Sequence, residues 1–375
     1  MKVLVIHSTE KISGGEKVSL EIIQGLKNQY EFVLFVPQKP DKDLRNSYFK
    51  NLNVICPPDK GLFSRIRILR KILIRKNFEI IHAHGTRAAF LARLAIIGLK
   101  NRPKIVYTLH GFHLIRRPFL FRWFFLSLEK ILNRWTDILV CVSEADKNLV
   151  LKYKTNTSEK IKIIKNGIDI EKFQATKELE EKTKKELGLE DNFVLCTIGR
   201  LHLQKDFSTV LRALNLIEFK MRNPKLLIVG DGPLRDSLER ETKGLGIEKY
   251  VNFLGFREDI PILINLSDII ILSTKWEGLP LTPLEAGASR KPIIASNIEG
   301  VKETIIDDKT GFLFNPGSAE DLAEKILTLY NQEELRKKTG ENAFRFVSEN
   351  FSKERMIQEY ENLYKEILNE NSSSK

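Results

Sequence analysis

Short runs of Val, Ile and Leu recur along this 375-residue chain, and stretches with helical periodicity separate them. The runs are continuous rather than alternating apolar and polar, which is typical of strands buried on both faces of a parallel sheet. This alternation predicts a doubly wound α/β fold. We expect two series of strands, at 3–7, 32–36, 79–82, 104–109, 138–142 and 161–164, then at 193–198, 225–229, 251–254, 268–272 and 292–295.

The length exceeds that of one ordinary α/β core and favours two domains. A charged segment without a strand, 177–190, separates the two series of strands. We therefore predict a first Rossmann-like domain at 1–170, a connector helix at 171–190, a second Rossmann-like domain at 191–345 and a terminal helical segment at 346–375. Two such domains are expected to face a central cleft, with functional residues just after the strands.

The positive charge of the chain is concentrated in one region. Residues 60–128 contain fifteen Lys or Arg and one acid, Glu79, so this stretch alone has a net charge of +14. The whole chain has a net charge of +12, so the residues outside this stretch are slightly negative together. Such a region can face nucleic acid, an anionic membrane or an anionic substrate. No apolar run is long enough to span a bilayer. The three cysteines lie in or beside apolar runs, and we expect buried free thiols in a reducing, cytoplasmic compartment.

Two segments of the basic region have the composition of protein segments that bind a membrane surface. In 62–76, an apolar stripe (Leu62, Ile66, Leu69, Leu73) runs beside a basic one (Arg67, Lys71, Arg75). In 112–125, six aromatic residues are interleaved with Arg116, Arg117 and Arg122. Both patterns favour contact with an anionic membrane. A core-packed helix with a solvated back would explain the first pattern as well, and stacked single-stranded bases the second.

Cations and glycines follow two strands of the second series. Gly199 and Arg200 come directly after the strand at 193–198, and Lys205 lies five residues beyond Arg200. Two cations at the end of a strand can neutralise a diphosphate. The next strand runs into Gly230-Asp231-Gly232-Pro233, which is a tight turn followed by a residue suited to the first helical position. Solvated surface charges and a plain turn are the structural alternatives.

The most informative segment is the loop 276–285, which follows the strand at 268–272. Thr282 is predicted to cap a helix, with Pro283 as its first residue and Glu285 completing a Thr-x-x-Glu capping box. That explanation needs no ligand for Glu285, but it does not account for Glu277. A carboxylate in a Gly/Pro-rich loop after a buried strand can accept hydrogen bonds from sugar hydroxyls, and loop amides can meet a phosphate.

Glycines and histidines follow strands of the first series. Gly14 and Gly15 lie between the first strand and a helical pattern, where backbone amides can approach an anion. His84 and His110 follow strands, and His110 is predicted to have a site role. The histidines lack a metal-ligand pattern such as His-Glu-x-x-His, so no metal site is predicted.

In order, these segments resemble the retaining family 4 glycosyltransferases (group 1 glycosyltransferases) of the GT-B type. The resemblance spans nearly the whole chain. It rests on the Gly14-Gly15 loop, YTLHGF around His110, VSEADK from Val142, IKNGID ending at Asp169, GRLHLQKD with Arg200 and Lys205, VGDGPLR from Val229, FLGF ending at Phe256, the pair Glu277 and Glu285, KPIIAS, GVKE and TGFLFNPG. Any one motif is weak, but the ordered set is specific. Pro280 and Arg290 stand where many members have Gly, and neither departure implies a different donor.

The resemblance implies a role for each matching residue. Arg200 and Lys205 would bind the diphosphate of a nucleotide-sugar, Glu285 its ribose and Glu277 the hydroxyls of its sugar. The donor site would further include Gly199, Gly232, Phe256, Arg257, Gly278, Leu279 and Leu281, and His110 with Gly14 and Gly15 would approach from the first domain. His84, Arg116 and Arg117 would lie on the acceptor side. His110, Glu277, Arg200 and Lys205 would be the catalytic set, with no metal or other cofactor, and the terminal helix would return to the first domain.

The sequence therefore predicts a retaining hexosyl- or N-acetylhexosaminyltransferase that uses a UDP-sugar. The expected acceptor is lipid-linked or a polysaccharide, in cell-surface glycan synthesis at the inner face of the plasma membrane, with no nucleic acid partner. Two alternatives remain at this point: a sugar-nucleotide epimerase of the same architecture, and a non-catalytic basic protein that binds membranes or nucleic acid.

Overall fold

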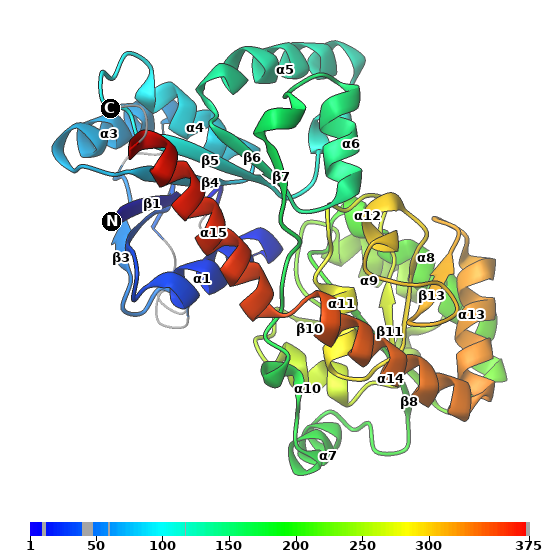
Figure 1. Cartoon of the computed structure of the whole chain (residues 1–375). Helices are drawn as coiled ribbons and strands as arrows, with labels where there is room; N and C mark the ends of the chain where they lie inside the picture. Colours follow the sequence, from blue (N-terminus) through cyan, green and yellow to red (C-terminus); the bar gives the residue numbers. More distant parts are fainter. Residues whose placement is uncertain (10–12, 40–47, 59–60, 117, 373–375) are drawn as a thin grey trace. The chain divides into compact units, whose positions relative to one another are not determined.

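The computed structural model describes residues 1–9, 13–39, 48–58, 61–116 and 118–372, with side chains as far as Asn369. The chain divides into two compact units (Figure 1). Unit 1 comprises Met1–Gly167 and Lys353–Lys375, and unit 2 comprises Ile168–Ser352. The last helix of the chain thus belongs to unit 1, as the family resemblance implies.

Over its described residues, unit 1 is built on a seven-stranded parallel sheet in the order β3-β2-β1-β4-β5-β6-β7. Its strands are β1 (Lys2–Ile6), β2 (Glu31–Phe35), β3 (Asn53–Ile55), β4 (Ile80–His84), β5 (Lys104–Leu109), β6 (Ile138–Cys141) and β7 (Ile161–Ile163). The central strands are buried on both faces, as their continuous apolar sequences predict. The strand order reverses between β1 and β4, which is where ligands bind in open α/β sheets.

Helices cover both faces of the unit 1 sheet. They are α1 (Gly14–Leu26), α3 (Leu62–Arg75), α4 (Thr86–Ile96), α5 (Phe119–Leu132), α6 (Glu144–Lys152) and α15 (Lys353–Ser372), with short 3-10 turns η1 (His113–Arg116), η2 (Asn133–Trp135) and η3 (Ser158–Lys160). Residues of α3, α4, α5 and α6 share one apolar core with the sheet. The helices α1 and α15 cover the other face of the sheet and pack against each other. Residues of both helices contact histidines on that face.

Unit 2 has, in its described residues, a six-stranded parallel sheet in the order β10-β9-β8-β11-β12-β13. The strands are β8 (Phe193–Ile198), β9 (Pro224–Val229), β10 (Val251–Gly255), β11 (Ile269–Leu272), β12 (Ile293–Ser296) and β13 (Phe312–Phe314). Around them lie α7 (Lys177–Glu186), α8 (Phe207–Ile217), α9 (Arg235–Gly244), α10 (Ile260–Asn265), α11 (Thr282–Ala288), α12 (Glu299–Lys302), α13 (Ala319–Asn331) and α14 (Glu333–Asn350), with η4 (Glu171–Phe173), η5 (Leu203–Lys205), η6 (Glu218–Lys220) and η7 (Glu248–Tyr250). Here the strand order reverses between β8 and β11.

The unit boundaries differ from the predicted domain limits by a few residues. The predicted connector at 171–190 is not a separate element, because α7 contacts α10 and lies inside unit 2. Residues 346–352 also belong to unit 2, since α14 continues to Asn350 and packs along α11. The short strands β3 and β13 were not among the strands expected from the sequence.

The free cysteines Cys141 and Cys196 are buried, as predicted, whereas Cys56 is half-buried. Within the part of the chain that the structure describes, no helix combines the length and the apolar sequence that crossing a bilayer requires.

Candidate functional site

The switch point of unit 2 brings together a cation and a carboxylate singled out in the sequence. Lys205, after β8, and Glu277, after β11, form an ion pair with 2.6 Å between Nζ and Oε1. Both side chains are largely buried, at 19% and 12% exposure. The Thr274 hydroxyl donates to the same Oε1 over 3.0 Å. The other oxygen of Glu277, Oε2, has no hydrogen-bond partner among the described residues, so it is available to a ligand hydroxyl.

Gln204 joins the two loops that carry this pair, and only its place in GRLHLQKD could have indicated this role. Its side chain donates to the Trp276 carbonyl over 2.7 Å, and its own carbonyl accepts from the amide of Lys275 over 2.8 Å. These bonds fix the loops after β8 and β11 against each other. Lys205 and Glu277 are therefore held by the backbone as well as by their own attraction.

Glycines allow the loops after β8 and β9 to approach closely. A Cβ at Gly232 would lie 2.4 Å from the Leu201 carbonyl oxygen, and one at Gly230 would lie 2.0 Å from that of Gly199. No side chain fits at such distances, so these positions require glycine. The Leu201 amide also donates to the Asp231 carbonyl over 3.0 Å. The predicted turn at 230–233 thus supports the loop that carries Arg200 and Lys205.

The capping box predicted at Thr282 and Glu285 is wrong. Helix α11 begins one residue earlier than expected, with Leu281 as its N-cap and without a side-chain cap, so Glu285 lies in the fourth helical position. The Glu285 amide instead donates to the Leu281 carbonyl over 2.8 Å. Glu285 is only 6% exposed. Glu285 is thus a buried carboxylate in the first turns of α11, outside the capping box that the sequence predicts.

Other residues predicted for this site lie around the same strand ends. Gly278 and Leu279 are buried in the loop after β11, and Leu281 is half-buried. Arg200 is exposed, and within the described residues no hydrogen bond or ion pair engages its guanidinium. Phe256 follows β10 and is 60% exposed. Arg257 forms a two-pronged ion pair with Asp259 at 2.8 and 2.5 Å, so its side chain is already engaged.

Four histidines converge at the switch point of unit 1. His7 follows β1, His82 lies in the middle of β4, His84 ends that strand, and His110 follows β5. Nδ1 of His84 and Nε2 of His110 are hydrogen-bonded at 3.1 Å, and the two rings are stacked. His7 bonds to Ser19 of α1 through Nε2. His84 and His110 were predicted. His7 and His82 were missed, although both stand at the end of a predicted strand.

Burial holds these four imidazoles neutral. Desolvation, aided by neighbouring histidines, lowers the pKa of His7 and of His82 to about 3 and that of His84 well below its ordinary value. Burial lowers the pKa of His110 to about 4. At neutral pH the cluster therefore offers hydrogen-bond donors and acceptors rather than positive charge. Nδ1 of His7 and Nε2 of His84 have no hydrogen-bond partner among the described residues.

The predicted glycine loop lies against this cluster. Gly14 and Gly15 are the first residues of α1 rather than a free turn. A Cβ at Gly15 would lie 2.8 Å from Cδ2 of His110. The imidazole can therefore occupy this position only because residue 15 has no side chain. Asp146, which the sequence did not single out by itself, accepts from the amide of Phe112 over 2.8 Å and so fixes the loop after His110.

The remaining acceptor-side predictions are not brought into the cluster. Arg116 is exposed at the end of η1, and Arg117 lies outside the described residues. In the described part of the chain, no three His, Cys, Asp or Glu side chains are grouped to hold a metal ion.

Two Rossmann-like units with side chains gathered at both switch points are the architecture of the GT-B fold. Two family descriptions match the chain, "Glycosyltransferase Family 4" over residues 12–172 and "Glycosyl transferases group 1" over residues 179–346. The capsular polysaccharide biosynthesis glycosyltransferase CapM of Staphylococcus aureus is 30% identical over 322 residues, which are 83% of this chain and 84% of that protein. The chain belongs to the group 1, family 4 glycosyltransferases.

A further relative agrees with the family, and a solved structure agrees with the fold. An Escherichia coli enzyme named UDP-Gal:alpha-D-GlcNAc-diphosphoundecaprenol alpha-1,3-galactosyltransferase is 29% identical over 354 residues and covers 89% of each chain. The fold matches that of Anabaena HepE, solved in complex with UDP-glucose, with a TM-score of 0.86 at 23% identity and full coverage of both chains. The chain is thus a GT-B glycosyltransferase of glycan biosynthesis.

Proposed function

We propose that this glycosyltransferase is a retaining enzyme that takes a UDP-sugar on unit 2. It moves a hexosyl or N-acetylhexosaminyl residue to a lipid-linked or polysaccharide acceptor of the cell surface. The observation that carries the proposal is that two residues bond to the same carboxylate oxygen of Glu277. Because Lys205 and Thr274 both occupy Oε1, the carboxylate is fixed in orientation and presents Oε2 as an acceptor for sugar hydroxyls.

The charges of unit 2 suit the departure of a diphosphate. The Lys205 ammonium has three donors and uses one on Glu277, so it can also bind a phosphate oxygen. Arg200 supplies a forked donor on the same loop. As the bond between the sugar and the diphosphate breaks, these fixed cations stabilise the charge that develops. We propose that this occurs without a metal ion, and that the acceptor hydroxyl attacks from the same face and passes its proton to the leaving phosphate.

Unit 1 is proposed to contribute neutral hydrogen-bonding groups. His110 is held neutral by burial, so it suits a sugar hydroxyl better than a phosphate. Its contact with Gly15 fixes the ring beside the start of α1. His110 is the catalytic candidate on this unit, and His84 is assigned to the acceptor side.

The choice of donor and acceptor rests on similar proteins. HepE was solved with UDP-glucose, and the E. coli relative is named for UDP-Gal and a diphosphoundecaprenol acceptor. These names support a UDP-sugar and a lipid-linked acceptor here.

A thermal-shift panel of UDP-, GDP- and ADP-sugars tests the donor assignment. A donor present at about a hundred times its dissociation constant stabilises the fold by about 2.7 kcal/mol, so only UDP-sugars should raise the melting temperature strongly. Preference for another base would overturn the UDP assignment. Transfer in the presence of EDTA and the anomeric configuration of the product test the metal-free, retaining mechanism. Conversion of the donor sugar in the absence of an acceptor would instead indicate an epimerase.

We further propose that unit 1 binds an anionic membrane surface through α5. Six apolar side chains of this helix are exposed, and five of them lie in its first two turns, namely Phe119, Leu120, Phe121, Trp123 and Phe124, with Ile131 near its end. Arg122 lies over the ring of Phe119. Exposed aromatic residues beside cations are typical of side chains that enter a bilayer interface. This surface is consistent with a peripheral protein at the inner face of the plasma membrane and requires no nucleic acid partner.

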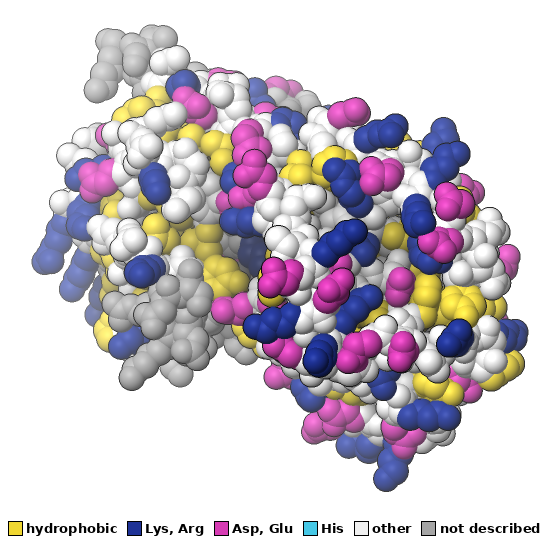
Figure 2. Space-filling model, turned by 90° about the horizontal axis from the view of Figure 1, so that it is seen from below, with side chains coloured by type: hydrophobic (Ala, Val, Ile, Leu, Met, Phe, Trp, Pro, Cys, Tyr) yellow, Lys and Arg dark blue, Asp and Glu magenta, His cyan; other side chains and the backbone are white. Residues whose placement is uncertain are grey.

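Helix α3 has a different role on this surface. Leu69 and Leu73 of its apolar stripe are buried in the core, whereas Phe63 and the basic residues Arg67, Lys71 and Arg75 are exposed. Lys and Arg side chains gather at the left edge of the face in Figure 2, the side on which α3 lies in Figure 1. Leu62 of the same stripe is 45% exposed, so the stripe is only partly packed into the core, and we propose that α3 adds its basic side chains and the exposed Phe63 to this surface.

Sedimentation with liposomes tests the membrane proposal. The wild type should bind anionic vesicles at low salt, and replacement of Phe121 and Phe124 by Ser should abolish binding. Replacement of Phe219, which is 73% exposed on unit 2, by Ser is the matched control. Equal sedimentation of wild type and the double variant would refute the role of α5.

A further inference from the structure

Two pairs of polar side chains lie side by side on the face of the unit 1 sheet that α1 and α15 cover. On β4, His82 and His84 are two residues apart, and on β5 and its end, Thr108 and His110 are two residues apart, so each pair shares a face. Nε2 of His82 and the Thr108 hydroxyl are hydrogen-bonded at 2.7 Å. His84 and His110 repeat this diagonal contact one step closer to the strand ends.

The inner pair is bonded to tyrosines from the last helix of the chain. The Tyr364 hydroxyl and Nδ1 of His82 are 2.6 Å apart, and the Tyr360 hydroxyl and the Thr108 hydroxyl are 3.2 Å apart. Both tyrosines are no more than 1% exposed. Residues more than 250 positions apart in the sequence thus form one buried network.

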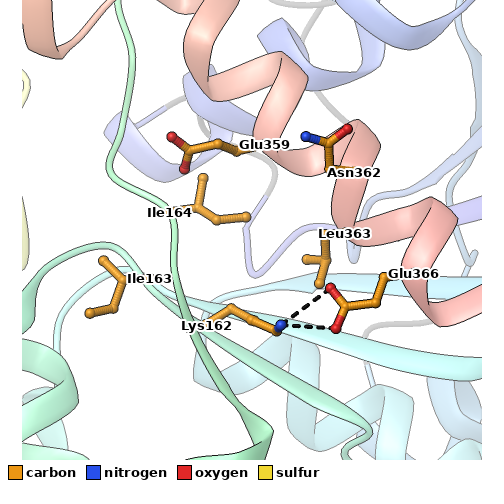
Figure 3. Close-up of a pocket in the computed structure, with 7 residues that line it drawn as sticks. All are labelled: Lys162, Ile163, Ile164, Glu359, Asn362, Leu363 and Glu366. Atoms are coloured by element: carbon orange, nitrogen blue, oxygen red, sulfur yellow. Dashed lines mark hydrogen bonds and ion pairs between the residues drawn. The ribbon is translucent and has the colours of Figure 1, made fainter.

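Helix α15 is anchored to unit 1 by a further contact. Figure 3 shows Lys162 on β7 reaching toward Glu366 of α15, and the Lys162 ammonium donates to both carboxylate oxygens over 2.9 and 3.2 Å. Nearer the start of the helix, the Arg355 guanidinium donates to the Lys165 carbonyl over 2.7 Å. The helix is therefore attached to unit 1 on both sides of the tyrosines. This holds their hydroxyls in place beside His82 and Thr108.

The hydrogen bonds of this network have defined donors and acceptors because His82 is neutral. Burial lowers the pKa of His82 to about 3, so one ring nitrogen carries a proton and the other does not. With both nitrogens bonded, one hydroxyl partner must donate and the other must accept. The two hydroxyls therefore set both the orientation of the His82 ring and which of its nitrogens carries the proton.

The orientation of His82 is passed on by direct contact. The rings of His82 and His84 are tilted against each other with centroids 4.1 Å apart, and the rings of His84 and His110 are stacked at 5.3 Å. A change in the His82 ring thus alters the packing of His84, whose Nδ1 holds His110.

We propose that Tyr364, with Tyr360 as its partner, is a positioning residue that fixes His110 through His82 and His84. Helix α15 is then part of the transfer site of unit 1 and more than a cover for its sheet. The effect on sugar transfer rests on the proposed function of His110, whereas the effect on the imidazole geometry does not.

The test combines histidine NMR with kinetics on the full-length protein. The chain has six histidines, so their imidazole nitrogens can be resolved in a long-range nitrogen correlation spectrum. In Tyr364→Phe, the signals of His84 and His110 should shift along with those of His82. The kcat for transfer should fall about tenfold while the KM for the donor changes less than about twofold, as for the loss of one positioning hydrogen bond. Tyr360→Phe should act in the same direction and serves if Tyr364→Phe folds poorly.

Tyr30→Phe is the matched control, because the ring of Tyr30 meets that of Tyr364 edge-on at 5.4 Å. It removes a hydroxyl from the same aromatic group and should leave the signals of His84 and His110 and the kcat unchanged. Unchanged signals of His84 and His110 in both Tyr364→Phe and Tyr360→Phe would overturn the positioning role. If His110→Gln keeps full transfer activity, the proposed role of His110 fails, and the spectra alone then decide whether Tyr364 positions the ring.

Discussion

The guanidinium of Arg290 lies directly over the ring of Phe344, 3.4 Å from its centroid. Arg290 follows helix α11 in a left-handed conformation, with a φ of 54°, which is the conformation that favours glycine at the end of a helix. Its side chain also pairs with Glu341 at 2.9 Å. The arginine therefore stands at a glycine position and offsets its backbone strain through contacts with α14.

This relationship predicts that Arg290→Gly has little effect on stability. The substitution relieves about 1 kcal/mol of left-handed strain and loses a cation–π contact worth about 1 kcal/mol. Arg290→Ala keeps the strain and loses the contact, so it should destabilise unit 2 by about 1–2 kcal/mol. Urea unfolding of the two variants measures the difference. A more stable Ala than Gly variant would contradict this explanation.

Arg93 and Glu129 should be strongly coupled. Arg93 is fully buried on α4 and bonds both oxygens of Glu129 on α5, at 2.9 and 3.1 Å. Glu129→Ala leaves a buried cation unpaired and should cost about 3–5 kcal/mol of unfolding free energy. Replacing both residues by Met should cost much less, because no unpaired charge remains. Denaturant unfolding tests this, and equal losses in the single and double variants would refute the coupling.

The buried histidines predict that unit 1 loses stability in mild acid. The pKa values of His7, His82 and His110 are lowered to between about 3 and about 4, so the folded state resists protonation. In the unfolded chain they protonate near pH 6.5. Their contribution is therefore complete above pH 6.5 and is lost as the pH falls toward 4, by about 1.4 kcal/mol per pH unit for each histidine.

Tryptophan fluorescence measures this effect in a Trp276→Phe background, where Trp123 and Trp135 report on unit 1 alone. The midpoint of urea unfolding should fall between pH 6.5 and 5. In His82→Asn, which removes one of the titrating groups, the slope should be smaller. A midpoint independent of pH over this range would show that the histidines are not held neutral.

Much of the fold could be predicted because buried parallel strands have a clear sequence signature. The central strands of both sheets appear as continuous apolar runs, whereas the three-residue edge strands β3 and β13 were missed, although β7, an edge strand of the same length, was predicted. The start of α11 was misplaced by one residue because Thr282 and Pro283 together imitate an N-cap and first turn. In the structure Leu281 takes the cap position instead.

The donor-side residues could be predicted singly, but not their contacts. Lys205 and Glu277 are 72 residues apart, and only the adjacency of β8 and β11 brings them together. The link between Tyr364 and His82 joins residues 282 positions apart, so no local pattern indicates it. His7 and His82 read as parts of strands, because an isolated histidine in an apolar run gives no sign of its neighbours in space.

The pair of Lys205 and Glu277 forms the proposed donor site, and donor binding and sugar transfer by Lys205→Ala decide whether it does. The control is Lys302→Ala, since Lys302 also forms an ion pair, with Glu299 at 2.8 Å, but on the exposed surface. Loss of Lys205 should lower kcat/KM for the nucleotide-sugar about a hundredfold, as expected for a group that stabilises the leaving charge, and should weaken donor binding in calorimetry. Lys302→Ala should match the wild type. Wild-type transfer and donor affinity in Lys205→Ala would contradict the account.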